Sequence, residues 1–273
     1  MRASTFALNG LVGLNRLNDE WRSAYAPIEG FADRFLEFTP GWADGYPWPI
    51  DPVRCWFRPF EYPYVVKHLP DQCTILDVGT AVTFFPLYLS SLGHRIIATD
   101  ADARMATFWE ALCRSLPEEW RELPRRVEYQ ISEAYRIPVT KQVDAVTSIS
   151  VLEHVADPPR LLTEMISKLR SGGTLILTMD VSLEAQIGVS ADHFAGIRDI
   201  LKTSCQPACP DGELVHPSDL IVWPASPTIL SKPATRPPSR WSVVRRTASR
   251  IKHSFVPVIG RSICLYVGAF IKK

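Results

Sequence analysis

Residues 73–102, CTILDVGTAVTFFPLYLSSLGHRIIATDAD, constrain the fold of this chain more than any other stretch. The run from Thr74 to Val78 is short and mostly apolar, and the Gly79 that follows is free of the steric limits that other residues have on φ. A second apolar run, Arg95 to Thr99, ends in Asp100. This order predicts a strand, a turn, a helix and a second strand, which is the βαβ unit of a doubly wound sheet.

The segment between the two strands carries signals for both ends of a helix. Thr83 is placed as its N-cap, Pro86 lies in the first turn, where a missing N–H costs nothing, and Gly93 is placed just past the end. We therefore expect a helix from Phe84 to Leu92.

The loop after the first strand indicates which ligand this unit can hold. Of the glycines in the dinucleotide-binding pattern G-x-G-x-x-G, it keeps only Gly79. A pyrophosphate needs bare backbone close to two phosphates, whereas a ligand with a ribose and no phosphate tolerates Ala81 and Thr83. Asp100 is placed to accept hydrogen bonds from the two ribose hydroxyls. The alternative is an ordinary buried strand pair that binds no ligand.

Three more strands and two more helices are expected downstream. The strands are Arg126 to Ile131, Val143 to Ser150 and Thr174 to Met179; the helices are Ala103 to Leu116 and one that begins after the cap Asp157 and ends at Gly172-Gly173. Strands that alternate with helices predict an α/β fold with a doubly wound, mostly parallel sheet and right-handed crossovers.

Polar residues fall at the carboxyl ends of four of these strands. They are Asp77, Asp100, Glu133 and Ser148. Ligands of doubly wound sheets bind in the crevice outside the carboxyl ends of the strands. The four placements therefore predict one shared binding crevice.

Composition excludes several classes of protein. With 273 residues, 46% hydrophobic and 22% charged, the chain can form one large globular domain with additions. Its six cysteines are scattered, which argues against a disulfide framework and for a reducing, cytoplasmic compartment. Residues 1–20 lack the pattern of a signal peptide, and no stretch approaches the ~20 apolar residues of a membrane span.

Charge is distributed unevenly along the chain. Residues 220–273 hold ten Lys and Arg and no Asp or Glu, so this tail is at +10 and the rest of the chain at −9. Within the tail we expect a basic amphipathic helix from Arg240 to His253 and a closing strand from Ser262 to Ile271. The basic face is either a solvated surface of the fold or a peripheral contact with an anionic membrane.

The first 70 residues do not follow the βαβ pattern. They read as helix, loop and helix, and their aromatic residues are expected to pack as a cap or lid over the sheet. We therefore divide the chain into an N-terminal cap, 1–70, and a main domain, 71–273. The main domain includes a Pro-rich connection, 224–239, and the basic helix with the closing strand, 240–273.

Five stretches together carry a resemblance to a known family. They are LDVGT (76–80), ATD (98–100), SEA (132–134), VDAVTSISVLEHV (143–155) and LRSGGTLILT (169–178). With these stretches the chain resembles class I S-adenosylmethionine-dependent methyltransferases of the ubiquinone and menaquinone biosynthesis type. The resemblance implies a Rossmann-like sheet closed by an antiparallel last strand, and S-adenosylmethionine as the cofactor.

The resemblance also implies roles for particular residues. Asp77 and the backbone of Gly79 and Thr80 would hold the methionine end of the cofactor. Asp100 would hold the ribose and Glu133 the adenine, while Ser148 and Ile149 would form the floor of the site. The adjoining Ala81, Ala101 and Ala134 complete the set of expected cofactor contacts.

The catalytic group and the substrate are less defined by the sequence. His154 is the best candidate for a general base, because its ordinary pKa lies near neutrality; the alternative is that it orients the loop around it. Some relatives bind a divalent metal through Glu-x-x-Glu-His, but Ser150 stands at the first position here, so we expect no metal. The leading hypothesis is a small-molecule methyltransferase. The alternatives are a nicotinamide-dependent oxidoreductase, a non-catalytic binding domain and a nucleic-acid methyltransferase, the last disfavoured by the acidic body.

Overall fold

The structure is a computed structural model that describes residues 6–13, 17–48, 58–182, 188–211, 222–223 and 263–273. Its helices are α1 (Asp19–Leu36), α2 (Arg58–His68), α3 (Phe85–Ser91), α4 (Arg104–Ser115), α5 (Pro158–Lys168) and α6 (Ala191–Ser204). Its strands are β1 (Gly10–Leu11), β2 (Thr74–Val78), β3 (Arg95–Asp100), β4 (Val127–Ile131), β5 (Val143–Ile149), β6 (Leu169–Ser182), β7 (Cys205–Pro207), β8 (Val222–Trp223) and β9 (Ile263–Lys272). A short 3-10 helix, η5 (Leu152–His154), follows β5.

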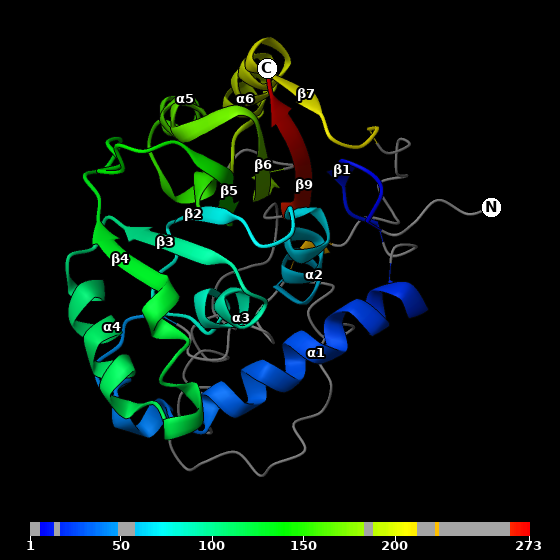
Figure 1. Ribbon diagram of the computed structural model, residues 1–273. Helices are drawn as coiled ribbons and strands as arrows, with labels where there is room; N and C mark the ends of the chain where they lie inside the picture. Colours follow the sequence, from blue (N-terminus) through cyan, green and yellow to red (C-terminus); the bar gives the residue numbers. More distant parts are fainter. Residues whose placement is uncertain (1–5, 14–16, 49–57, 183–187, 212–221, 224–262) are drawn as a thin grey trace, which may run out of the picture.

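The strands form one mixed sheet in the order β1-β9-β6-β5-β2-β3-β4 (Figure 1). The pairs β2–β3, β2–β5, β3–β4 and β5–β6 are parallel. The last strand, β9, lies antiparallel to β6 over the register Thr174↔Ile271 to Ser182↔Ile263. The predicted fold class, a doubly wound and mostly parallel sheet with an antiparallel last strand, is therefore confirmed.

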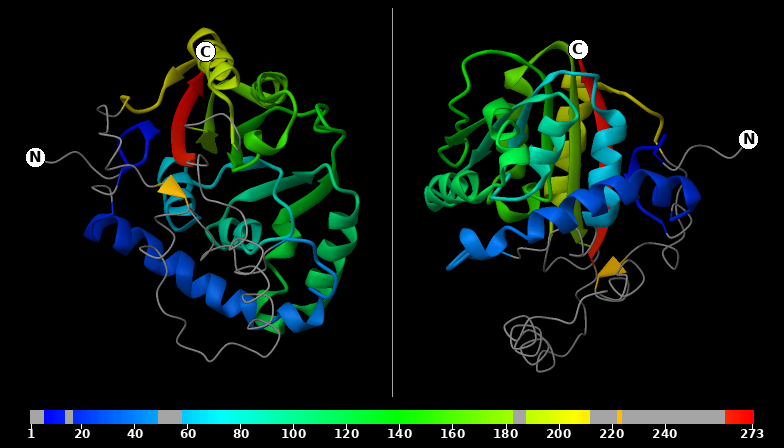
Figure 2. Two further views of the ribbon diagram at one scale, coloured as in Figure 1. Left: turned by 180° about the vertical axis from the view of Figure 1, so that it is seen from behind. Right: turned by 60° about the horizontal axis from the view of Figure 1, so that its bottom comes forward.

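Alternate residues of each strand face two separate cores. On β2, Ile75 packs into a core shared with α1, α2, α3 and α4, whereas the next residue, Leu76, packs into a core shared with α5 and α6. Figures 1 and 2 show the two helical layers on opposite faces of the sheet. In the predicted N-terminal cap, α2 packs against β6 and β9, and α1 packs on α2 and α3.

Three short strands line the outer side of β9. Strand β8 pairs with Ile263 and Cys264, β1 with Tyr266 and Val267, and β7 with residues 270–272. These pairings cover a strand edge that would otherwise present unpaired backbone groups.

Most helix ends lie where the sequence predicted them. Asp157 caps α5 by accepting a hydrogen bond from the amide of Arg160 at 3.1 Å. Gly93 has φ +95°, as a residue just past a helix end requires. At the start of α3, Phe84 takes the N-cap position that was predicted for Thr83.

The predicted end of α5 was wrong. The helix ends at Lys168, and the stretch that contains Gly172-Gly173 belongs to β6. The physical reason is that Leu169 is extended, with φ −73° and ψ 139°, and pairs with Val143 of β5. Strand pairing therefore begins before the glycines, which lie at an irregularity in the β5–β6 register.

Several predictions concern residues outside the described ranges. They are the Pro-rich connection 224–239 and the basic helix 240–253. Of the helices in the described ranges, none combines the length and the apolar character that a membrane crossing needs.

Candidate active site

The register of three parallel strands brings the predicted site residues to one edge of the sheet. Asp77 is paired with Ala98 of β3 and Thr147 of β5, and Val78 is paired with Ser148. Asp100 is the last residue of β3. Because parallel strands end on the same side, Asp77, Asp100 and Ser148 lie at a common edge.

Asp77 is buried at this edge, with 3% of its surface exposed. The hydroxyl of Thr147, its register partner on β5, donates a hydrogen bond of 2.6 Å to Oδ1 of Asp77. Burial raises the pKa of Asp77, and the Thr147 hydrogen bond acts against that rise. An acid in this position is held rigidly by the strand beside it.

The loop after β2 folds back onto the end of β3. The amides of Gly79 and Thr80 donate to the carbonyl of Thr99 at 2.8 and 3.1 Å, and the amide of Ala81 donates to Oδ2 of Asp100 at 2.9 Å. Gly79 and Ala81 have φ values of +71° and +48°. The loop therefore needs left-handed backbone at two positions, and only the first is a glycine.

Asp100 accepts a second hydrogen bond, 2.9 Å long, from the amide of Asp102 to its Oδ1. Burial raises its pKa, and the hydrogen bond from Asp102 acts against that rise. Tyr129 of β4 donates to the carbonyl of Ala81 at 2.8 Å and stacks on Trp109, with ring centroids 5.3 Å apart. The loop, the end of β3 and two aromatic rings are thus fixed together.

Glu133 and Ala134 follow β4 and are exposed. Glu133 exchanges backbone hydrogen bonds of 3.2 and 3.0 Å with Arg136, and the amide of Ser132 donates to the carbonyl of Asp100 at 2.8 Å. The turn that carries Glu133 is therefore tied to the end of β3. Ala101 lies at that strand end too and is exposed.

Ser148 and Ile149 form the end of β5. Ser148 is fully buried, and its hydroxyl has no hydrogen-bond partner among the residues that the structure describes. The carbonyl of Ile149 accepts from Nη1 of Arg58 at 3.4 Å. A buried hydroxyl without a partner, beside two strand-end carboxyl groups, fits a ligand that brings its own hydroxyl or amino groups.

His154 ends the 3-10 helix η5 and is exposed. Partial burial of the ring lowers its pKa, and the positive charge of Arg58 lowers it further. Both effects favour the neutral imidazole, the form that can accept a proton.

The structure adds a cluster of one arginine and three acidic side chains that the sequence analysis missed. Arg58 and Glu61 of α2 form an ion pair of 2.8 Å. Oε1 of Glu61 accepts from the hydroxyls of Ser150 and Thr178 at 2.6 and 2.5 Å. The amide of Asp180 donates to Oε1 of Glu153 at 3.4 Å. Asp180 was predictable, since it directly follows the expected strand end at Met179; the part played by Glu61 was not, because it lies 117 residues from Thr178.

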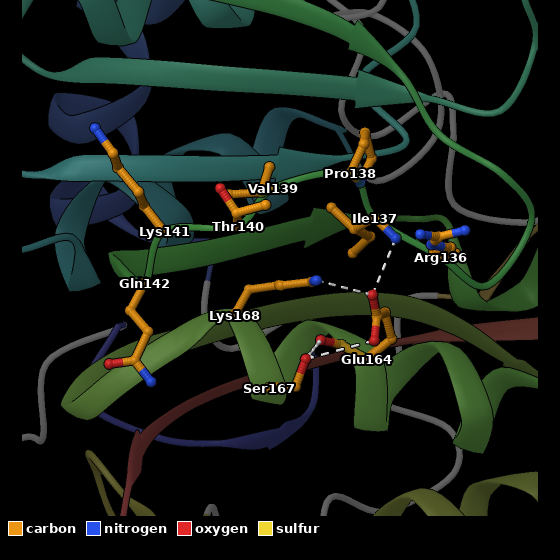
Figure 3. A pocket seen from close by; sticks show the side chains of 10 residues that line it. All are labelled: Arg136, Ile137, Pro138, Val139, Thr140, Lys141, Gln142, Glu164, Ser167 and Lys168. Carbon is orange, nitrogen blue, oxygen red and sulfur yellow. Dashed lines mark hydrogen bonds and ion pairs between the residues drawn. The ribbon is translucent and has the colours of Figure 1, made fainter.

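A hollow in the surface lies apart from the strand edge that carries the predicted site residues. A hollow of about 580 Å³ is lined by the loop from Arg136 to Gln142 and by Glu164, Ser167 and Lys168 of α5 (Figure 3). It contains none of the predicted site residues, and Glu164 already binds the amide of Ile137 and the Lys168 ammonium.

Within the described ranges no three His, Cys, Asp or Glu side chains are gathered as metal ligands. The expected absence of a metal stays a prediction.

Comparisons with known proteins agree with this arrangement. A family model described as a methyltransferase domain matches residues 76–177. The ubiquinone biosynthesis O-methyltransferase of Xanthomonas axonopodis pv. citri is 28% identical over 151 residues, which are 54% of this chain and 59% of that protein. The protein of the same name from Xanthomonas campestris pv. campestris is 26% identical over 196 residues, 70% of this chain and 76% of that one. The match to the Xanthomonas axonopodis protein thus spans less than two thirds of that protein's length.

Solved structures share the fold. The [4+2]-cyclase SpnF has a TM-score of 0.51 at 15% identity, with 77% of this chain and 80% of that chain covered. The YcgJ protein from Bacillus subtilis has a TM-score of 0.50 at 15% identity, with 78% and 98% covered. At such identities the likeness shows the fold alone.

Proposed function

We propose that this chain, which carries a class I S-adenosylmethionine-dependent methyltransferase domain, transfers a methyl group from S-adenosylmethionine to an oxygen, nitrogen or carbon atom of a small molecule. The observation that carries the proposal is the common edge of Asp77, Asp100 and Ser148 on neighbouring parallel strands. The loop from Gly79 to Ala81, whose amides bind the end of β3, supports the proposal further.

The proposed cofactor contacts are those that the family resemblance implies. Asp77 and the backbone of Gly79, Thr80 and Ala81 would hold the charged methionine end, since the Asp77 carboxyl is fixed by Thr147. The remaining contacts are Asp100 and Ala101 for the ribose, Glu133 and Ala134 for the adenine, and Ser148 and Ile149 for the floor. When bound, the cofactor supplies a methyl group on a sulfonium, so the protein needs chiefly to align the acceptor and exclude water.

His154 is proposed as the general base for an acceptor that attacks through a hydroxyl. Its neutral imidazole lies on the 3-10 helix directly after β5, and the amide of His154 is held by the carbonyl of Val151 at 2.9 Å. A base of this kind removes the hydroxyl proton as the oxygen attacks.

Calorimetric titration with S-adenosylhomocysteine and with NAD tests the proposal. We expect S-adenosylhomocysteine to bind in the micromolar range and NAD not to bind, because the loop lacks the bare backbone that a pyrophosphate needs. NAD binding without S-adenosylhomocysteine binding would instead indicate an oxidoreductase. Binding of neither would indicate a non-catalytic domain.

A cytoplasmic location and a peripheral membrane contact complete the proposal. The free thiols of Cys73, Cys113, Cys205 and Cys264 support a reducing compartment. The +10 charge of residues 220–273 supports contact with an anionic membrane, and the −9 charge of the rest disfavours nucleic acid. Co-sedimentation with anionic vesicles should fall at high salt and in the variant Arg245→Gln/Arg246→Gln. Vesicle binding that is unchanged both at high salt and in the double variant would refute the membrane contact.

A further inference from the structure

Three acidic side chains and one arginine gather around the carboxyl-terminal parts of β5 and β6. Arg58 and Glu61 come from α2, Glu153 from η5 and Asp180 from β6. Glu61 and Asp180 are 1% and 4% exposed. On β9, Cys264 is paired with Val181, the residue after Asp180; burial raises the pKa of its thiol, and the charge of Asp180 raises it further. With all three acids ionised, this cluster would carry two more negative than positive charges.

Both carboxylate oxygens of Glu61 have hydrogen-bond partners, but one oxygen of Glu153 and one of Asp180 do not. Glu61 accepts from Arg58, Ser150 and Thr178. Oε2 of Glu153 and Oδ1 of Asp180 are buried and have no hydrogen-bond partner among the described residues. A buried carboxylate oxygen without a partner is costly, so each of these atoms needs a proton, a bound water or a ligand.

The charges in the cluster favour a positive ligand at these two oxygens. Burial raises the pKa of Glu153, and the negative charge of Asp180 raises it further. Burial also raises the pKa of Asp180, the charge of Glu61 adds to that rise, and Arg58 opposes it. A cation placed between Glu153 and Asp180 would relieve the repulsion that holds protons on them.

The cluster lies beside the loop that the proposed function assigns to the cofactor. A Cβ added to Gly79 would lie 2.5 Å from Cγ2 of Val151, two residues before Glu153. On the other side, Arg58 reaches the carbonyl of Ile149 at the end of β5. A group held by Glu153 and Asp180 is therefore close to the loop from Gly79 to Ala81.

We propose that Glu153 and Asp180 bind the methyl acceptor through a positively charged nitrogen, so that the acceptor is a primary or secondary amine. This inference rests on the proposed function. An ammonium group offers a charge and several N–H donors, which match two carboxylate oxygens from different elements. A metal ion fits less well, since the third acid, Glu61, already accepts from Arg58, Ser150 and Thr178, and within the described ranges no three acidic, histidine or cysteine side chains are placed to hold one.

The pair can also release the nucleophile. One N–H bond of the ammonium breaks, its proton forms an O–H bond with a carboxylate oxygen of Asp180 or Glu153, and the electron pair of that N–H bond stays on nitrogen as a lone pair. The amine is then neutral and able to attack a methyl group. The proton leaves to water when the product leaves. For such an acceptor His154 does not take the proton.

Titration of the full chain saturated with S-adenosylhomocysteine tests the proposal. The probes are ethylammonium and benzylammonium chloride, their neutral counterparts ethanol and benzyl alcohol, and magnesium chloride. We expect at least one ammonium ion to bind and its alcohol not to bind. Asp180→Asn and Glu153→Gln should each weaken ammonium binding roughly 30-fold or more, because each leaves the bound charge without one partner. Asp199→Asn, at an exposed site on α6, is the matched control and should bind as the parent does.

Further readouts separate recognition from folding and from the proposed function. Circular dichroism shows whether each variant is folded, and Glu153→Gln serves if Asp180→Asn is not. In buffers of different ionisation enthalpy, ammonium binding to the parent should release protons. Equal binding of alcohols, tighter binding of magnesium, no ammonium binding, or ammonium binding that survives both variants would each overturn the inference. Failure of S-adenosylhomocysteine to bind would instead overturn the proposed function.

Discussion

Asp100 joins the loop after β2 to the end of β3 with a single side chain. Its two oxygens accept from the amides of Ala81 and Asp102, both at 2.9 Å. Under the proposed function the same carboxylate also accepts from the ribose hydroxyls. Loss of this side chain therefore removes an anchor of the loop and a ligand contact together.

We expect Asp100→Ala to weaken S-adenosylhomocysteine binding roughly tenfold to a hundredfold, because unmet hydrogen-bonding groups cost ~1 to 3 kcal/mol. Calorimetric titration measures the change. Asp199→Ala on α6 is the control, since its side chain is 78% exposed. A folded Asp100→Ala protein with the affinity of the parent would show that the ribose assignment is wrong.

Asp180 should make stability depend on pH. Its folded-state pKa is raised above the ordinary 3.8, so the folded chain holds more protons than the unfolded chain above that pH. The free energy of unfolding should then fall as pH rises above 3.8, at most by about 1.4 kcal/mol per pH unit for each such group. In Asp180→Asn the fall should be smaller. Urea unfolding at a series of pH values gives the slopes, and equal slopes in both proteins would contradict the assignment.

The residues at strand ends were predictable because a short apolar run followed by an acid marks an edge position. Asp77 and Asp100 were found in this way. Glu61 was not, since nothing in the sequence of a helix states which distant strand it will meet. Its partners Ser150 and Thr178 are 89 and 117 residues away.

At the scale of elements, the loop between β2 and α3 depends on close packing as well as on glycine. Gly79 has φ +71°, and Val151 leaves no room for a Cβ. Gly45 has φ +73° and open space around it. Substitution at Gly45 thus tests backbone strain alone, whereas substitution at Gly79 tests strain and overpacking together.

Gly79→Ala should lower the free energy of unfolding by about 2 to 4 kcal/mol, because about 1 kcal/mol of strain adds to the cost of overpacking. Gly45→Ala should cost only about 1 kcal/mol of strain. Urea unfolding of both variants provides the comparison. Equal losses of unfolding free energy in the two variants would mean that the Val151 side chain moves aside without an energetic cost.

The alternation of strands and helices was readable because period-2 and period-3.6 patterns are local. Strand β2 begins and ends where the sequence placed it, at Thr74 and Val78. The start of β6 was missed because Leu169 extends only when Val143 lies beside it. Strands β1 and β7 were missed for a related reason, since two or three residues carry no periodic signal and are strands only through β9.

At the scale of the whole molecule, Asn9 connects the N-terminal segment to β9. Its side-chain amide lies between β1 and β7 along the outer edge of β9 and is fully buried. It accepts from the amide of Ala269 at 2.9 Å and donates to the carbonyl of Ala269 at 3.3 Å. It also accepts from the hydroxyl of Tyr64 on α2 at 3.0 Å.

Asn9→Ala should lower the free energy of unfolding by about 2 to 4 kcal/mol, since the buried amide of Ala269 loses its outer acceptor and several bonds disappear together. Asn18→Ala is the comparison, because Asn18 caps α1 through the amide of Trp21 and its loss is local, about 1 kcal/mol. Chemical denaturation measures both. A smaller effect at Asn9 than at Asn18 would show that the link to β9 is dispensable.

The place of β9 inside the sheet also sets the order in which a growing chain can fold. Residues 183–262 separate β6 from the strand that pairs with it. Closing so long a segment costs little in final stability but slows the search for the native pairing. During synthesis, β2 to β6 emerge first and leave the side of β6 from Thr174 to Ser182 unpaired. Until β9 arrives, that bare edge is open to strands of neighbouring chains, so the arrival of residues 263–272 ends the period in which the newborn protein is most prone to aggregate.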